Sequence, residues 1–275
     1  MRLNLLLPRA LRRFNYVFVS GLCLFWAVGT VQAETIQHAG SDARTLRVAY
    51  MEFPPVTYQN AFGEPEGEMV GITRKVAKEA GYELKFLYLP VSRAYLYLKN
   101  GSIDFALGLT EVPTLNGAVI DSEINLVSVV LSAWYREGQA PLTGIDDLRD
   151  QVVILVNGFT YGGLRSWLER QDDIRITDAP NHRSAIDMLK RGRGDYLLDY
   201  RDPVREELMR FSDALIQETE IRTRTGAWLF SAAIPEAQTL KAEFDAAYHR
   251  LAERGELSPA DTGDIATLLQ GFPTP

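Results

Sequence analysis

The chain has 275 residues, a formal net charge of −7 at pH 7 and a single cysteine. The first 33 residues hold four arginines and no acidic residue, so the remaining 242 residues carry 25 basic and 36 acidic side chains, a net charge of −11. This acidic balance argues against nucleic acid and anionic membrane surfaces as partners. One cysteine cannot form an internal disulfide, and three widely separated histidines lack metal-ligand spacing, so we expect no metal and no cofactor.

The N-terminal segment predicts export. Four arginines precede the apolar stretch Val17–Val28, and Val31-Gln32-Ala33 has the small residues of a cleavage site. The stretch is shorter than the roughly 20 apolar residues of a membrane-spanning helix. Residues 1–33 are therefore predicted to be a signal peptide and residues 34–44 a flexible leader. The expected location is the periplasm, without stable membrane insertion.

Strands and helices are predicted to alternate in the first half of the remaining chain. A strand at Leu46–Tyr50 runs into the turn Phe53-Pro54-Pro55, and Gly71 is expected to open the next helix. Ser92 is the expected N-cap of the helix after that. The following segments are predicted as helix, strand, helix and strand: Ile72–Ala80, Leu84–Leu89, Arg93–Lys99 and Ile103–Leu109. This order is typical of a parallel sheet with right-handed crossovers.

The second half repeats this order after a long strand-like segment at Asn125–Tyr135. The predicted strands are Val152–Val156, Ile174–Thr177 and Tyr196–Tyr200. The predicted helices between and after them are Leu164–Arg170, a helix that Asn181 caps and that ends at Lys190, and Pro203–Phe211. A returning strand at Ile221–Ala232 and a helix at Ala237–Arg254 follow. Two chain crossings without a low-complexity linker predict a two-strand hinge between two α/β lobes, with a ligand cleft between them. We assign residues 45–130 plus 226–275 to lobe 1 and residues 131–225 to lobe 2.

The first lobe supplies five candidate ligand-binding residues. Phe53, between a strand end and two prolines, is expected to stack on a flat or apolar part of a ligand, with Tyr50 adding a hydroxyl; the alternative is a core aromatic residue. Arg93 stands at a helix start, where the helix dipole disfavours a cation, so we expect a partner anion there. Thr110 and Glu111 follow a buried strand, where α/β sheets present ligand groups. Glu111 would bind a ligand cation or neutralise Arg93.

The second lobe supplies four more candidates. Thr160 lies in a glycine-rich loop before a helix, a place where free backbone N–H groups can hold an anion. Phe159 and Tyr161 flank it as candidate lids. Asp199 ends a strand and is placed to meet a ligand amine, with Asp202 as the rival position.

The sequence resembles the periplasmic solute-binding proteins of the polar amino acid type, the bacterial extracellular solute-binding family 3. The resemblance covers nearly all of the exported chain and rests on six segments in the correct order: LRVAYMEFPPVTY, GEMVGITRKVAKEAG, PVSRAYLYLKNGSIDFALG, GIDDLRDQVVILVNG, MLKRGRGDYLLDY and HRLAERGEL. It implies a type 2 periplasmic-binding fold, a two-lobe α/β clamp that closes on a small solute and presents it to a permease. One position departs from the pattern, because Leu115 falls where the family has an arginine that grips the ligand α-carboxylate.

The resemblance implies a monomeric binder of a small polar or charged solute, working with an ABC permease and without catalysis. Two alternatives use the same fold. The first is an enzyme that resembles cyclohexadienyl dehydratase, in which Arg93 and Glu111 would act on the substrate. The second is a free-standing sensing domain that acts on a separate partner.

Overall fold

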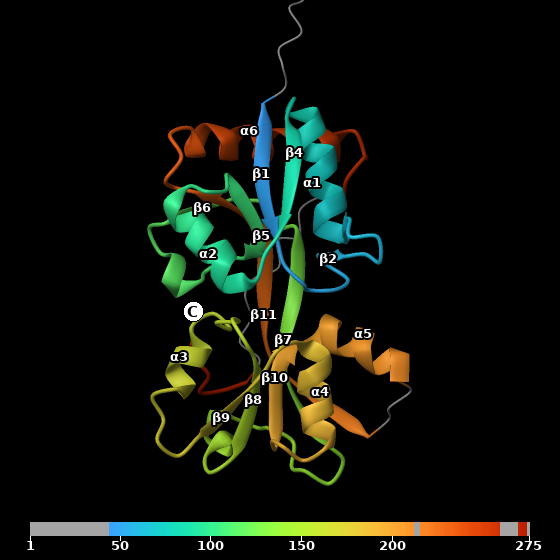
Figure 1. Ribbon diagram of the computed structural model, residues 1–275, viewed down its shortest axis with the longest axis vertical. Helices are drawn as coiled ribbons and strands as arrows, with labels where there is room; N and C mark the ends of the chain where they lie inside the picture. Colours follow the sequence, from blue (N-terminus) through green and yellow to red (C-terminus); the bar gives the residue numbers. More distant parts are fainter. Residues whose placement is uncertain (1–43, 212–214, 259–268, 274–275) are drawn as a thin grey trace, which may run out of the picture. The chain divides into compact units, whose positions relative to one another are not determined.

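The computed structural model describes residues 44–211, 215–258 and 269–273 (Figure 1). The predicted signal peptide, and the leader except Arg44, lie outside the described residues. The helices are α1 (Glu68–Glu79), α2 (Val91–Asn100), α3 (Leu164–Leu168), α4 (His182–Lys190), α5 (Arg201–Phe211) and α6 (Ala237–Glu253). The strands are β1 (Thr45–Tyr50), β2 (Tyr58–Gln59), β3 (Pro65–Glu66), β4 (Glu83–Tyr88), β5 (Phe105–Leu109), β6 (Val119–Asp121), β7 (Val127–Arg136), β8 (Val152–Val156), β9 (Arg175–Ala179), β10 (Tyr196–Tyr200) and β11 (Ile216–Ser231).

Two α/β lobes share one continuous sheet, in the order β4-β1-β5-β11-β7-β10-β8-β9. In lobe 1, β1 pairs in parallel with β4 and β5; in lobe 2, β8 pairs in parallel with β9 and β10. The long strands β7 and β11 run antiparallel to each other and join the two groups (Figure 1). This arrangement confirms the predicted two-lobe fold with a two-strand hinge.

Each lobe packs helices on both faces of its strands, because successive strand side chains point to opposite faces. In β1, Leu46 and Val48 pack in the cluster that includes α1 and α6, whereas Ala49 packs in the cluster of α2. In β8, Leu155 joins the cluster that includes α3, and Ile154 joins that of α4. The carboxyl ends of the parallel strands are thereby left free to present loops toward the hinge.

The hinge strand β11 pairs with different strands along its length. Its segment from Gly226 to Phe230 pairs with β5 of lobe 1, and the register with β7 shifts between Glu220 and Arg222. Such a bulge bends a strand and increases its local twist. The backbone carbonyl of Ile221, at this shift, accepts a hydrogen bond of 3.1 Å from the Leu269 N–H.

Two local details differ from the sequence predictions, and a third agrees with them. Helix α1 begins at Glu68 rather than after Gly71, because Gly67 adopts a φ of 118° and a Cβ there would overlap the Val56 carbonyl. Helix α2 begins at Val91 after Pro90, so Ser92 lies within the helix and is not its N-cap. By contrast, Asn181 caps α4 as predicted, its side chain accepting a 2.8 Å hydrogen bond from the Ser184 N–H.

The C-terminal segment 269–273, grouped above with lobe 1, contacts lobe 2 and the hinge. Gln270 forms a β-bridge with Gly144, and the Pro273 carbonyl accepts a 2.6 Å hydrogen bond from Arg222. The exact residue boundaries of the lobes stay a prediction.

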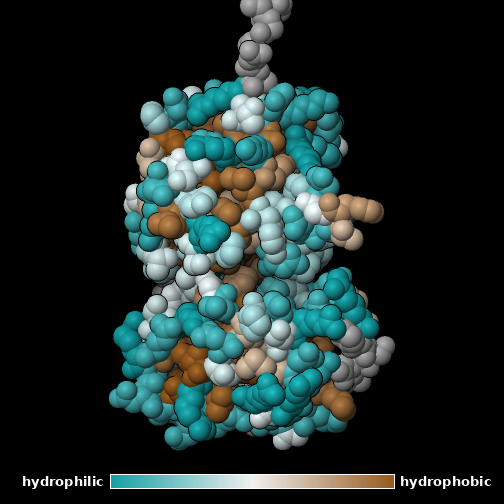
Figure 2. Space-filling view, in the orientation of Figure 1, coloured by the Kyte–Doolittle hydropathy of each residue, from teal (hydrophilic) through white to brown (hydrophobic). Residues whose placement is uncertain are grey.

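The face shown in Figure 2 is largely hydrophilic, with apolar atoms in small separate groups. Among the described residues, no helix is both long enough and apolar enough to cross a bilayer.

Candidate functional site

An inner cavity of about 50 Å³ lies where the two lobes meet the hinge. Lobe 1 lines it mainly with apolar side chains and lobe 2 with the loop after β8 and the end of β10. The lining residues that matter below are Phe53, Tyr95, Phe159, Thr160, Tyr200 and Arg224. Ligand sites usually have roughly 300–1,000 Å³, so a solute of amino-acid size requires the lobes to separate before it enters.

A larger cavity of about 620 Å³ lies beside it and is also lined from both lobes. Met51, Val91 and Phe159 line both cavities and therefore form the wall between them. Phe159 is the lobe 2 member of this wall and is only partly buried. Its position fits the lid role predicted for it, because movement of this ring would join the two cavities.

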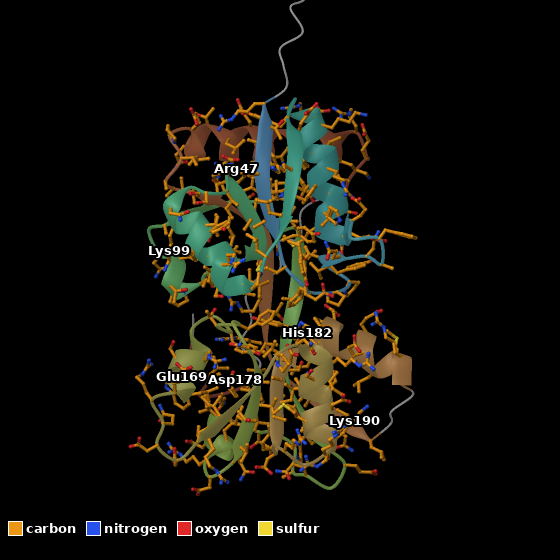
Figure 3. The ribbon with its side chains drawn as sticks, in the orientation of Figure 1. Arg47, Lys99, Glu169, Asp178, His182 and Lys190 are labelled. Carbon is orange, nitrogen blue, oxygen red and sulfur yellow. The ribbon has the colours of Figure 1, made fainter. Side chains whose placement is uncertain are left out.

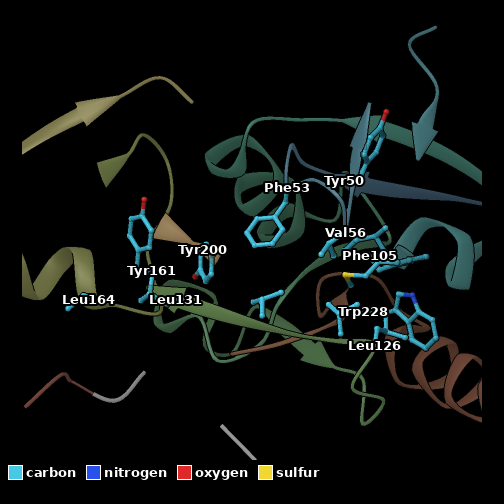
Figure 4. Close-up of a cluster of buried hydrophobic side chains, with 14 of the residues drawn as sticks. Tyr50, Phe53, Val56, Phe105, Leu126, Leu131, Tyr161, Leu164, Tyr200 and Trp228 are labelled. Carbon is cyan, nitrogen blue, oxygen red and sulfur yellow. The ribbon is translucent and has the colours of Figure 1, made fainter. Parts of the chain in front are cut away.

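Phe53 is the main lobe 1 contact across the cleft. Its ring centroid lies 5.1 Å from that of Tyr200, 6.2 Å from that of His182 and 6.3 Å from that of Phe159, all three in lobe 2. Figure 4 shows the Phe53 and Tyr200 rings beside each other. The side chain is buried, and its peptide neighbours Pro54–Pro55 are joined in cis. Phe53 is thus both a wall of the inner cavity and the residue on which lobe 2 closes.

Four polar side chains converge on the inner cavity. Burial, with the neighbouring Tyr200, raises the pKa of Tyr95 to about 12, against an opposing hydrogen bond from Thr160. Burial also raises the pKa of Tyr200, and the positive charges of Arg224 and Arg222 oppose that rise. The uncharged hydroxyls of Tyr95, Thr160 and Tyr200 therefore line the same mainly apolar cavity as the Arg224 guanidinium.

Arg224 is a site residue that the sequence reasoning missed. It lies on the hinge strand and is fully buried, like Arg222 two positions before it. Its Nη2 donates to the backbone carbonyls of Thr110 and Glu111. Its Nε and Nη1 have no hydrogen-bond partner among the described residues. The Tyr200 hydroxyl lies close to the Arg224 guanidinium, whose charge and hydrogen bonding both oppose the rise in the pKa of Tyr200.

The signal that would have found these arginines is their spacing on the predicted crossing strand. Arg222 and Arg224 are two residues apart and so share one face of β11. The R-x-R spacing predicts that the two side chains lie on the same side of the strand, and the packing of the lobes decides whether that side is buried.

Asp199 is fully buried and pairs with His182, another residue of lobe 2. Its Oδ2 lies 2.7 Å from His182 Nδ1, and its Oδ1 accepts a 2.8 Å hydrogen bond from the Tyr200 N–H. His182 begins α4 and lies at the lobe junction, where it packs against Phe53 (Figure 3). Burial lowers the pKa of His182, but the pair with Asp199 and the nearby Glu52 carbonyl outweigh it, so the net pKa is raised.

The N–H groups at the start of α3 do not have the anion-binding role predicted for the glycine-rich loop after β8. Helix α3 is only five residues long, and the N–H groups of Gly163, Leu164 and Arg165 donate to carbonyls of the same loop. These N–H groups are therefore not free to bind an anion. The loop instead brings Thr160 to the cavity and places the Tyr161 carbonyl as an acceptor for Arg222.

The other predicted site residues lie outside the inner cavity. Tyr50 lines a separate cavity of about 520 Å³ in lobe 1 and lies apart from Tyr200 in Figure 4. Arg93 is exposed on α2, and Glu111 lines a small cavity of about 110 Å³ beside Leu115. Thr110 contributes its carbonyl rather than its side chain, since its N–H and hydroxyl both bond to the Thr225 carbonyl.

Asp202, the rival to Asp199, does not line the inner cavity; it lines a different cavity of about 600 Å³. Leu115 is buried in an apolar cluster with α2 residues and does not line the inner cavity either. In the part of the chain that the structure describes, no group of three or more His, Cys, Asp or Glu side chains is arranged to hold a metal ion.

Solved structures with a similar arrangement show which fold the chain has. A histidine kinase sensor domain with similarity to periplasmic binding proteins has a TM-score of 0.69 and 20% identity, over 78% of this chain and 92% of that chain. An ancestral arginine-binding protein bound to arginine has a TM-score of 0.64 and 18% identity, over 77% of this chain and 93% of that one. The arginine-, lysine-, histidine-binding protein ArtJ from Geobacillus stearothermophilus has a TM-score of 0.64 and 17% identity, over 78% and 91% of the two chains. The chain therefore has the type 2 periplasmic-binding fold.

Part of the lobe 1 sequence matches a known protein family. Residues 46–114 match the bacterial extracellular solute-binding proteins, family 3, which confirms the predicted relationship over this segment. No curated protein sequence matches the chain. The family and two of these neighbours are described as binding proteins, and the third neighbour is described as a sensor domain with similarity to them.

Proposed function

We propose that this protein is a periplasmic solute-binding protein whose lobes close on one small solute at the inner cavity. The observation that carries the proposal is the convergence of Tyr95, Thr160, Tyr200 and Arg224 on an apolar cavity between two lobes joined by two strands. A few polar groups in an apolar cleft are typical of a ligand site. A two-strand hinge supplies the opening that the cavity volume requires.

The biological role that we propose is delivery of the solute to an ABC permease after export through the signal peptide of residues 1–33. The bacterial extracellular solute-binding family supports this role, as do two further structural neighbours that are described as substrate binding proteins of ABC transporters. The clamp would act as a monomer, without a cofactor, because one chain carries both walls of the cavity. A single chain with both lobes needs no partner to complete the site.

A thermal-shift measurement tests the binding function. The purified protein would be heated with amino acids, polyamines, organic acids and prephenate, each at high concentration. A solute at 100 times its dissociation constant adds about 2.7 kcal/mol of stability. Stabilisation by one class, with the compound recovered unchanged, supports a binding protein. Recovery of a converted compound would instead support the dehydratase-like alternative, and no stabilisation by any class would contradict the proposal.

A further inference from the structure

Two arginines are buried on the hinge strand, and the charge of Glu111 attracts Arg222 without forming an ion pair with it. Arg222 and Arg224 are both fully buried, and neither forms an ion pair with a carboxylate of the described residues. Burial, followed by repulsion from Arg224, lowers the pKa of Arg222 to about 10. An unpaired buried charge is costly, so a chain that keeps two of them side by side calls for an explanation.

The surrounding backbone holds Arg224 in place at a conformational cost. Glu111, whose carbonyl accepts from Arg224, has a φ of 55°, and Tyr161, whose carbonyl accepts from Arg222, has a φ of 51°. Non-glycine residues rarely adopt positive φ, and such strain clusters at ligand sites. Gly162 packs directly on the Arg224 guanidinium, where a Cβ would overlap Nη1.

Arg224 keeps donors available for a ligand. Only Nη2 is satisfied, by two backbone carbonyls, while Nε and Nη1 are buried and unpartnered among the described residues, on a side chain that lines the inner cavity. A guanidinium is a strong donor to anions. The hydroxyls of Tyr95, Thr160 and Tyr200 beside it can add uncharged hydrogen bonds.

The same cavity has no carboxylate for a ligand cation. Neither Asp nor Glu lines it, and the candidate carboxylate of Asp199 is occupied by His182 and the Tyr200 N–H. An amino acid would bring an ammonium group that has no partner there, and leaving such a charge unpaired strongly disfavours binding. The position where the family grips the amino-acid carboxylate is the buried Leu115.

We propose that Arg224 binds the carboxylate of a small organic acid that lacks an ammonium group, with the apolar body of the acid against Phe53 and Phe159. This assignment rests on the proposed solute-binding function and names its ligand class. The carboxylate supplies the counter-charge that the buried arginines lack, and the strained backbone at Glu111 keeps Arg224 oriented.

The test compares matched compounds by calorimetry and thermal shift on the purified protein. One set is 3-phenylpropanoate, phenylalanine, phenethylamine and phenyl phosphate; an aliphatic set is hexanoate, norleucine and hexylamine. We expect the carboxylates to bind most tightly in their sets. Preference for the amino acid or the amine would overturn the proposal, and preference for phenyl phosphate would overturn the carboxylate assignment.

Arg224→Met is expected to weaken carboxylate binding by roughly 100-fold or more, since a buried charge contact is lost. Arg222→Met is the matched control, because it removes a buried arginine of the same strand that does not line the inner cavity, and it should change affinity by less than roughly tenfold. Arg224→Lys keeps the charge and should retain more affinity than Arg224→Met.

The unliganded melting temperature separates a binding role from a structural one. Arg224→Met removes an unpaired buried charge, so it should keep or raise the melting temperature of the unliganded protein while it abolishes binding. A lower melting temperature together with wild-type affinity for the carboxylate would overturn the proposal. If a solute of any class binds equally to wild type and Arg224→Met, the binding function stands and this assignment fails; if nothing binds, the proposed function itself fails.

Discussion

Phe53→Ala should open the clamp rather than unfold the protein. Phe53 follows β1 of lobe 1, yet its three ring partners, Tyr200, His182 and Phe159, all belong to lobe 2. Loss of this ring removes contacts that exist only when the lobes are together. The free energy that it contributes therefore stabilises the closed state relative to the open one.

The magnitude follows from the three ring pairs. Each aromatic pair contributes about 0.5–1.5 kcal/mol beyond area burial, so the three pairs together contribute about 1.5–4.5 kcal/mol. A central value of about 3 kcal/mol changes a closed-to-open equilibrium by roughly 100-fold. A clamp that is mostly closed without ligand would become mostly open, and its ligand affinity would fall by a similar factor.

The assay is a distance measurement between two spin labels, one in each lobe. Cys23 is the only cysteine of the chain, so Cys23→Ser leaves a background in which Lys99→Cys of α2 and Arg170→Cys after α3 can be labelled uniquely. We expect the Phe53→Ala variant to show a longer and broader distance distribution than wild type. Phe105→Leu is the control, because its ring partners lie within lobe 1 and its loss should lower the melting temperature without changing the distance.

An unchanged distance distribution together with a lowered melting temperature in Phe53→Ala would refute this reasoning. That result would make Phe53 an ordinary core residue of lobe 1, equivalent to Phe105. The proposed closing contact would then have to be sought elsewhere.

Three further predictions follow from buried contacts. Gly162→Ala should displace the guanidinium of Arg224 and lower carboxylate affinity by roughly tenfold or more in calorimetry, because the new Cβ overlaps Nη1; unchanged affinity would separate this glycine from the site. His182 has a raised pKa in the folded protein, so its protonated pair with Asp199 stabilises the fold below pH about 6.5, and this stability is lost as pH rises through the folded pKa. Melting curves of wild type should show that decline and those of His182→Gln should not. Leu115→Arg should cost about 3 kcal/mol or more in chemical denaturation without creating amino-acid binding, because the side chain lies in an apolar cluster away from the inner cavity.

The fold was predictable because its signals are local. Strands such as Val152–Val156 and Tyr196–Tyr200 are apolar runs with turn residues around them, and the structure has them at the predicted bounds. The strands that were missed, β2, β3 and β6, have only two or three residues. Segments of that length are too short to show a periodicity.

The site was only partly predictable. Phe53, Phe159, Thr160 and Tyr161 follow strand ends, where α/β folds present ligand groups, and the structure brings all four to the inner cavity. Arg224 lies in the middle of a strand, where a single charge usually indicates a solvated face. Only the packing of the lobes and the bulge of β11 place it in the interior.

Asp199 shows a second limit of sequence reasoning. Its position at the end of β10 is correct for a ligand group, but its carboxylate is already paired with His182, seventeen residues earlier in the chain. Neither residue has a motif that indicates the other. Pairing between side chains of different elements is decided by tertiary packing.

The most direct test of the central claim is to identify the solute that the protein carries. The wild-type protein and Arg224→Met would be purified from cells without unfolding, denatured, and the released small molecules analysed by negative- and positive-ion mass spectrometry. We expect wild type to release a small organic acid without an amine, in about equimolar amount, and Arg224→Met to release none. Release of an amino acid or a cation by wild type, or of the same acid in equal amount by both proteins, would contradict the account.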